Sequence, residues 1–292
     1  MNWWNEGLQL KLRIRPAGLV LALLYAIACW ASRQLSLDQF YLPAGVRVAA
    51  VLLFPPRWWP YLLLGEYAYF AQMRVPMIEK YGLAWIVLGS ALLMPAVMLI
   101  VHLHRKMMVT TKNAWLISVA AASALVVTAL NLMLAHLLWP TPPEMPVIAS
   151  IARLVVGDFI GILTLAPLAL LWTRRTSNAR WTSGFAPPAL AALTMMAMIG
   201  LYAAQLPLDE VNAKTSMQLL MALPVVVLTC LYGWRGAAIG VPSLNLIIGL
   251  TTPSPYTGAF DPAAFATQQI MAVTGAALLV LGSRITHYYP RS

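Results

Sequence analysis

The sequence consists of long apolar runs separated by short segments that contain prolines, glycines and charged residues. Apolar runs of about 20 residues have the length that an α-helix needs to cross the hydrocarbon core of a bilayer. The pattern predicts an all-α, polytopic transmembrane helical bundle of about ten spans. Six of the predicted spans cover 17–35, 83–103, 114–138, 153–172, 188–206 and 265–285, and two more flank a tight turn at 232–236. The remaining two, starting at Gly45 and at Trp58, are short, so a broken or re-entrant hairpin there would reduce the number to eight.

The composition agrees with this pattern and excludes an ordinary soluble domain. Of the 292 residues, 61% are hydrophobic and 10% are charged, and the mean hydropathy is +0.75. Such values are typical of integral membrane proteins. We expect a basic interfacial segment at 1–16, a membrane domain at 17–286 and a short tail at 287–292. No signal-peptide cleavage site is recognisable, so the first apolar run is expected to remain as a span.

The distribution of lysine and arginine predicts that both termini lie in the cytoplasm. The net charge is +10, and the positive-inside rule accounts for it without nucleic acid as a partner. In a ten-span arrangement with both termini inside, four bases lie outside: Arg33, Arg74, Lys80 and Lys214. Those on the cytoplasmic side are Lys11, Arg13, Arg15, Arg57, Arg105, Lys106, Lys112, Arg174, Arg175, Arg180, Arg235, Arg284 and Arg291. This asymmetry favours an inside location for the N-terminus and the C-terminus.

Four ionisable residues fall within predicted spans: Arg47, Glu66, Arg153 and Asp158. Charged side chains are costly in a bilayer and generally have partners there. One interpretation is a structural ion network that ties spans two, three and six together. The other is a ligand-binding or switch site, in which the arginines would suit an anionic small molecule because guanidinium groups bind carboxylate and phosphate.

The sixth predicted span, 153–172, separates its small and polar residues from its bulky apolar ones. On a helical wheel, Arg153, Gly157, Asp158, Gly161 and Thr164 fall within an arc of about 140°. A face of small residues allows another helix to approach closely. We therefore expect Gly157 and Gly161 to serve in helix packing, and the two charged residues to face the interior of the bundle.

Motifs for catalysis or for metal binding are not recognisable in the sequence. There is no phosphate-binding loop, dinucleotide fingerprint, nucleophile elbow or zinc-protease motif. His102 and His104 are two residues apart and His136 is expected at the other membrane face, so the histidines do not form a metal site. Cys29 and Cys230 lie in apolar runs and are expected to be free thiols. We expect a protein without enzymatic activity of its own and without a cofactor.

Three stretches carry a resemblance to a known family: FYLPAGVRVAAVLLFPPRWWPYLLLGE, VVGDFIGILTLAPLALLW and ALPVVVLTCLYGWRGAAIG. Together they resemble the type-one membrane-associated sensor (MASE) domain, and the resemblance covers nearly the whole chain. The LP-x-G-x-R and P-R-x-W-P segments are similar to the input domain of UhpB-type sensor histidine kinases. The resemblance implies a polytopic module of the bacterial inner membrane, with about eight spans, that precedes a kinase, cyclase or phosphodiesterase domain.

The resemblance and the intramembrane charges together lead to a functional hypothesis. We expect a sensory module that detects an outer-side ligand or a membrane partner and relays the signal to a cytoplasmic output of the histidine kinase or cyclic-di-GMP type. That output is expected in a fused or associated signalling domain, because the sequence ends soon after the last predicted span. A small-solute transporter or channel, or a non-catalytic scaffold subunit of a membrane complex, remains an alternative.

Overall fold

The computed structural model of the protein describes residues 15–36, 40–110, 115–140, 148–173, 185–207, 210–251 and 262–288. Most of the predicted basic segment and most of the predicted tail lie outside these residues. The helices are α1 (Pro16–Gln34), α2 (Leu42–Leu53), α3 (Trp59–Arg74), α4 (Ile78–Tyr81), α5 (Leu83–Thr110), α6 (Trp115–Leu138), α7 (Ile148–Thr173), α8 (Ala186–Gln205), α9 (Val211–Tyr232), α10 (Trp234–Thr251) and α11 (Pro262–Tyr288). Two 3-10 turns, Pro56–Trp58 and Val75–Met77, precede α3 and α4.

A helix corresponds to each of the ten predicted spans, and the all-α polytopic bundle is confirmed. Seven of the described helices are long and apolar enough to cross a membrane, namely α1, α5, α6, α7, α8, α9 and α11. The helix α2 has 12 residues and α3 has 16, which correspond to lengths of about 18 Å and 24 Å. Both are shorter than the hydrocarbon core of about 30 Å, so the exact number of spans stays a prediction.

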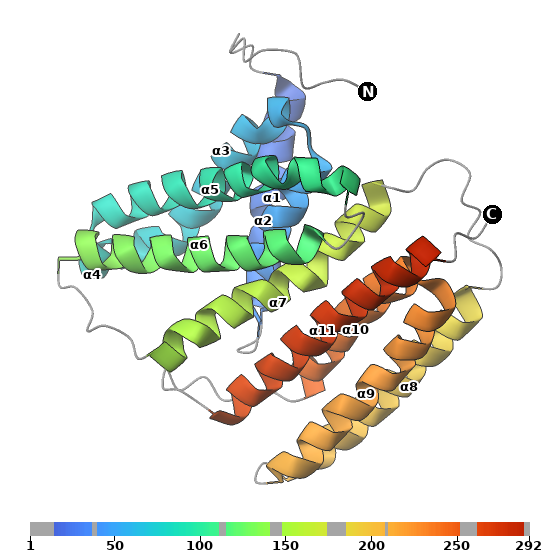
Figure 1. Cartoon of the computed structure of the whole chain (residues 1–292). Helices are drawn as coiled ribbons and strands as arrows, with labels where there is room; N and C mark the ends of the chain where they lie inside the picture. The colour runs from blue at the N-terminus through green and yellow to red at the C-terminus, as the bar shows by residue number, and fades with distance from the viewer. Residues whose placement is uncertain are drawn as a thin grey trace.

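Successive long helices alternate in direction, so that the start of α1 and the end of α11 lie at the same end of the molecule (Figure 1). We call this the proximal end and the opposite one the distal end. The turn between α2 and α3 lies at the proximal end, as does the α9–α10 turn. Under the predicted orientation, the proximal end would face the cytoplasm.

Proline and glycine mark the helix boundaries. Proline occupies the first or second position of α1, α2, α3 and α8, where its missing N–H group removes no helical hydrogen bond. Gly233 joins α9 to α10 with a φ of 59°, a conformation that side chains with a Cβ rarely adopt. This glycine accounts for the tight turn that the sequence predicts at 232–236.

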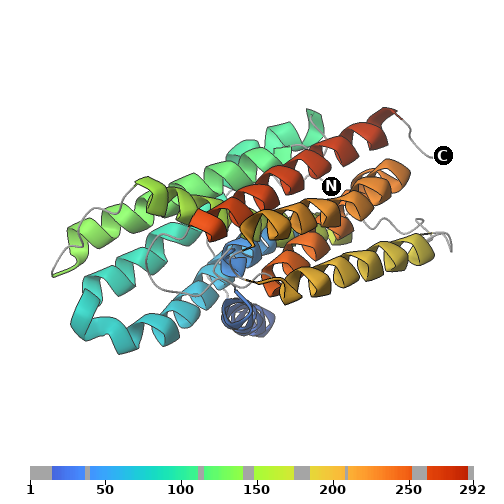
Figure 2. The same ribbon diagram turned by 90° about the horizontal axis from the view of Figure 1, so that it is seen from below.

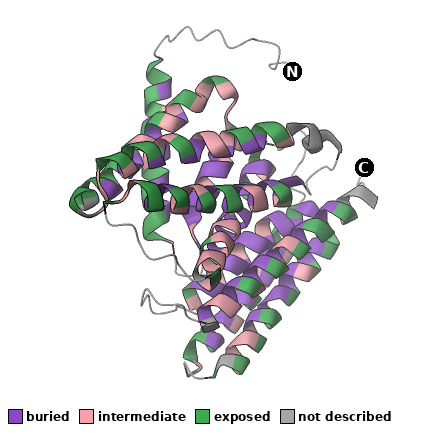
Figure 3. Ribbon diagram, turned by 60° about the vertical axis from the view of Figure 1, so that its left-hand side comes forward, coloured by how far each residue is buried: buried purple, intermediate pink, exposed green. Residues whose placement is uncertain are grey.

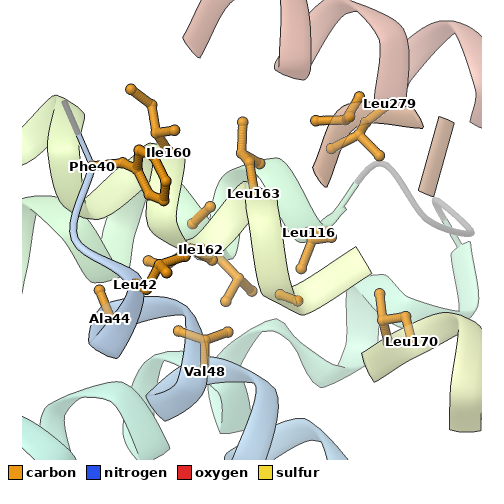
Figure 4. Packing of buried hydrophobic residues seen from close by; sticks show 14 of the residues in the cluster. Phe40, Leu42, Ala44, Val48, Leu116, Ile160, Ile162, Leu163, Leu170 and Leu279 are labelled. Carbon is orange, nitrogen blue, oxygen red and sulfur yellow. The ribbon is translucent and has the colours of Figure 1, made fainter. Parts of the chain in front are cut away.

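Helix α7 lies between an N-terminal half, α1–α6, and a C-terminal half, α8–α11. It packs against α2 and α6 on one side and against α10 and α11 on the other, and the outermost helices α1 and α8 lie at the edges (Figure 2). Buried residues line the surfaces between helices, whereas exposed residues cover the outer faces (Figure 3). In the core around α7, Ile160 lies near Phe40 and Ile162 lies near Leu42 of α2 (Figure 4).

Most of α2 is buried. Its buried residues are Leu42, Pro43, Ala44, Gly45, Arg47, Val48, Ala50 and Val51. A helix surrounded by protein can carry a charged side chain at membrane depth, because partners on the neighbouring helices replace water. The position of α2 therefore explains how Arg47 comes to lie in the interior.

Candidate functional site

Arg47 of α2 and Glu66 of α3 form an ion pair in the interior of the bundle. Arg47 Nε and Nη2 donate hydrogen bonds to Glu66 Oε1 over 2.8 Å and 2.5 Å. Arg47 is 2% exposed and Glu66 is 0% exposed. Charge-assisted hydrogen bonds in such a dry environment are strong, but the two charges have also lost their hydration. Removing one of the two charges would therefore leave the other buried without a partner and would destabilise the fold.

The second oxygen of the Glu66 carboxylate also has a donor. The hydroxyl of Tyr25, in α1, donates a hydrogen bond to Glu66 Oε2 over 2.5 Å, and its oxygen lies 3.9 Å from the sulfur of Met94, in α5. Tyr25 is buried. Side chains from α1, α2, α3 and α5 thus meet at one point, and the carboxylate of Glu66 joins three of these helices through hydrogen bonds.

The helix that carries Arg47 is held against α7 by backbone contacts. The backbone N–H of Tyr41, just before α2, donates a hydrogen bond to the Gly157 carbonyl of α7 over 3.1 Å. A Cβ added at Gly45 would overlap the Gly161 carbonyl, and a Cβ added at Gly161 would overlap the Tyr41 carbonyl. The missing side chains therefore permit the close approach of α2 and α7.

Asp158 lies on α7 beside this interface, half-buried. It is close enough to Arg47 and to Tyr41 for electrostatic interaction with both. Its carboxylate makes no hydrogen bond with the residues that the structure describes. Arg47 is consequently flanked by two acidic groups, one that binds it directly and one at longer range.

Arg153, the fourth predicted site residue, lies in the second turn of α7 and is half-buried. It makes an interaction, and it is not the partner in the Arg47–Glu66 ion pair or the charge that acts on Asp158, which is Arg47. The arc that it shares with Asp158 on the helical wheel is wide enough for the two side chains to reach different neighbours. The structure therefore groups three of the four predicted residues.

A layer of tyrosines lies distal to the ion pair. The hydroxyls of Tyr41 and Tyr69 are 3.2 Å apart, and the Tyr69 ring contacts the Phe70 ring at 5.1 Å between centroids. The guanidinium carbon of Arg33 lies 5.4 Å from the centroid of the Tyr41 ring. This layer connects the end of α1, the start of α2 and the middle of α3.

Sequence reasoning missed Tyr25 and Tyr41 as members of the site. Each sits within or beside an apolar run, where a tyrosine can serve simply as a large apolar side chain with one polar end. The available signal was weak. Glu66 needed donors at membrane depth, and Tyr25 is the tyrosine of the first predicted span.

A separate polar contact lies between α7 and α10. The side-chain amide of Asn245 donates a hydrogen bond to the Thr164 hydroxyl over 3.0 Å, and both residues are fully buried. Buried amide and hydroxyl side chains commonly hydrogen-bond across helices in membrane proteins. The contact fixes α7 to the C-terminal half of the molecule.

These features define a polytopic α-helical membrane protein with a buried ion pair at the crossing of its N-terminal helices. A model of the MASE1 family, a family of membrane-associated sensor domains, matches residues 14–288. The chain therefore belongs to the MASE1 family and is a membrane-embedded sensory module. Neither the curated proteins nor the solved structures provide a match.

Proposed function

We propose that the chain is the input module of a bacterial inner-membrane signalling system, and that the Arg47–Glu66 pair with Asp158 is its switch. The observation that carries this proposal is the position of α7, which contacts α2 on one side and both α10 and α11 on the other. A change in how α2 sits on α7 would therefore reach the last helix through packed contacts.

The proposed mechanism uses two arrangements of the same helices. A ligand or membrane partner at the distal end would favour one arrangement of α1, α2 and α3, and the buried pair would stabilise each arrangement to a different degree. A ligand shifts such an equilibrium only by its difference in affinity for the two states. Helix α11 would then carry the change to the proximal end.

The output is proposed to be a cytoplasmic signalling domain or partner, of the histidine kinase or cyclic-di-GMP type. Nothing in the proposed mechanism requires catalysis by the membrane module. Its task is to change the position of a helix end, and helix shifts of about 1–2 Å at an interface are common in switching proteins.

Asp158→Asn tests the proposal because it removes a charge near Arg47 while keeping the shape of the side chain and leaving Glu66 in place. The chain would be fused after Ser292 to a diguanylate cyclase, and cyclic-di-GMP would be measured at matched membrane levels. We expect the basal output to change about fivefold or more, a typical coupling between sites.

Glu210→Gln is the matched control, because Glu210 is an exposed carboxylate at the start of α9. We expect this variant to signal like the unchanged chain. An Asp158→Asn variant that inserts and folds normally and also signals normally would refute the switch role of this residue.

A further inference from the structure

Arg74, the last residue of α3, is a buried cation at the distal end of the molecule. Its guanidinium carbon lies 4.0 Å from the centroid of the Phe70 ring and 3.9 Å from that of the Trp85 ring. Gly89 leaves the space that the guanidinium group fills, because a Cβ at this position would overlap Arg74 Nη1. Arg74 is 7% exposed, so its environment is closed on several sides.

Among the described residues, no carboxylate forms an ion pair with Arg74, whereas Arg47 pairs with Glu66. The hydrogen bond from Arg74 Nη1 to the Trp85 carbonyl is long at 3.5 Å. The aromatic rings stabilise the faces of the guanidinium group. The N–H groups in the plane of the guanidinium group, which can bind carboxylate or phosphate, make only this long hydrogen bond to the described residues.

Two indole donors also lack acceptors, one in the Trp85 ring that contacts Arg74 and one in the neighbouring Trp139 ring. The indole nitrogens of Trp85 and Trp139 are buried and have no hydrogen-bond partner among the described residues. The two rings meet edge to face at 5.7 Å between centroids, and the Tyr81 ring packs on both, at 5.1 Å and 4.3 Å. We call Arg74, Trp85 and Trp139 the distal donor cluster.

An ordinary aromatic belt accounts for part of this arrangement. Tryptophan and tyrosine are common at membrane interfaces, where the ring is apolar and the indole N–H reaches water or lipid headgroups. Here both indole nitrogens are buried, and the Trp85 ring also contacts a cation. A buried cation in an aromatic group with two unpartnered donors has the chemistry that an anion satisfies.

We propose that the distal donor cluster binds an anionic group, a carboxylate or a phosphate, with Arg74 as the charged ligand residue and the two indoles as additional donors. The site differs from the one predicted at Arg47 and Arg153, because Glu66 already neutralises Arg47. The anion is either a dissolved molecule or a lipid headgroup, and the test separates these sources.

The cluster is connected to the switch through α3. Arg74 follows Glu66 by eight residues on the same helix, or about 12 Å along its axis. Phe70 contacts Arg74 on one side and Tyr69 on the other, and Tyr69 meets Tyr41. A regulatory effect of the anion rests on the proposed function, whereas binding itself does not.

The experiment measures the thermal unfolding temperature of the purified chain. In detergent it is titrated with inorganic phosphate and with succinate, against sodium chloride at equal ionic strength. In nanodiscs it is compared between phosphatidylglycerol and phosphatidylcholine. We expect a saturable rise with phosphate or succinate if the source is soluble, and a rise in phosphatidylglycerol alone if it is a lipid.

Variants assign the effect to the cluster. We expect Arg74→Gln to weaken the apparent affinity at least tenfold. Trp139→Phe keeps the aromatic packing but removes one orphan donor, and we expect it to weaken binding severalfold without loss of folding. Lys214→Gln, which removes one charge near the start of α9, is expected to bind like the unchanged chain.

Two results would overturn the proposal. One is the absence of a saturable rise with phosphate, succinate and phosphatidylglycerol alike. The other is a rise that Trp139→Phe and Arg74→Gln leave unaltered, since that would show non-specific charge screening; if Arg74→Gln does not fold, Trp139→Phe decides alone. Anion binding together with unaltered signalling in the cyclase fusion would keep the site and count against its role in sensing.

Discussion

Arg47 Nη2 lies 2.5 Å from Glu66 Oε1, and both side chains are almost closed to solvent. The two residues come from different helices that follow each other in the chain, so the pair fixes α2 to α3. Tyr25 adds α1 to the same carboxylate. The N-terminal helices are therefore held together by a single polar centre within an apolar interior.

Replacing one member of this pair should destabilise the protein far more than replacing both members. Glu66→Gln or Arg47→Met leaves one buried group without its partner, and we expect each to lower the free energy of unfolding by about 3–5 kcal/mol. The double variant Arg47→Met with Glu66→Leu should lose much less, because neither charge remains. Unfolding of the purified protein by dodecyl sulfate in mixed micelles measures all three. Additive losses in the double variant would contradict this account.

The contact between α2 and α7 should not tolerate a methyl group at Gly161. An added Cβ meets a backbone carbonyl, which cannot turn away as a side chain can. We expect Gly161→Ala to lower the free energy of unfolding by about 1–3 kcal/mol, typical of overpacking, despite the higher helix propensity of alanine. The same dodecyl sulfate titration measures it.

Gly275→Ala in α11 is the control for this prediction. A Cβ there would lie 3.1 Å from Val241 Cγ1 and 3.6 Å from Leu163 Cδ1, which are side-chain ends that can adjust. We expect a neutral or slightly stabilising effect. Equal destabilisation by both alanine variants would show that the approach of α2 to α7 has no special role.

The sequence predicted the membrane bundle well because the signal is strong. An apolar run as long as 153–172 is rare outside membrane-spanning helices, and the helix α7 includes all of this run. The short second span was also expected, since only a few apolar residues separate Gly45 from the turn at Phe54. Its burial was not evident, because apolar composition does not distinguish contact with lipid from contact with protein.

The pairing of the charges was harder to predict than their presence. A helical wheel orders residues around one helix, but it does not say which neighbour lies at each angle. Arg153 and Asp158 therefore looked like members of one site, whereas the charge that acts on Asp158 in the structure is that of Arg47. The ten-span arrangement places Arg74 among the bases on the outer side, but its aromatic surroundings could not be predicted, because they come from α5 as well as α3.

If the Arg47–Glu66 pair sets the position of α11 through α7, the loss of the pair should change the distance between the α2–α3 turn and the end of α11. Spin labels would be placed at Arg57, in the α2–α3 turn, and at Arg284, near the end of α11, because both side chains are exposed. Labels at Arg235 and Arg284 report within the C-terminal helices and serve as the reference. Cys230, which is exposed, would first be replaced by serine.

The distances would be measured by pulsed electron resonance in the unchanged chain, in Glu66→Gln and in Arg47→Met with Glu66→Leu. We expect the Arg57–Arg284 distance distribution to shift by about 2 Å or to gain a second population, as in other helix-shift transitions, while the Arg235–Arg284 distance stays the same. Unaltered distributions for both label pairs in a folded double variant would contradict this expectation, and the ion pair would then be a structural support.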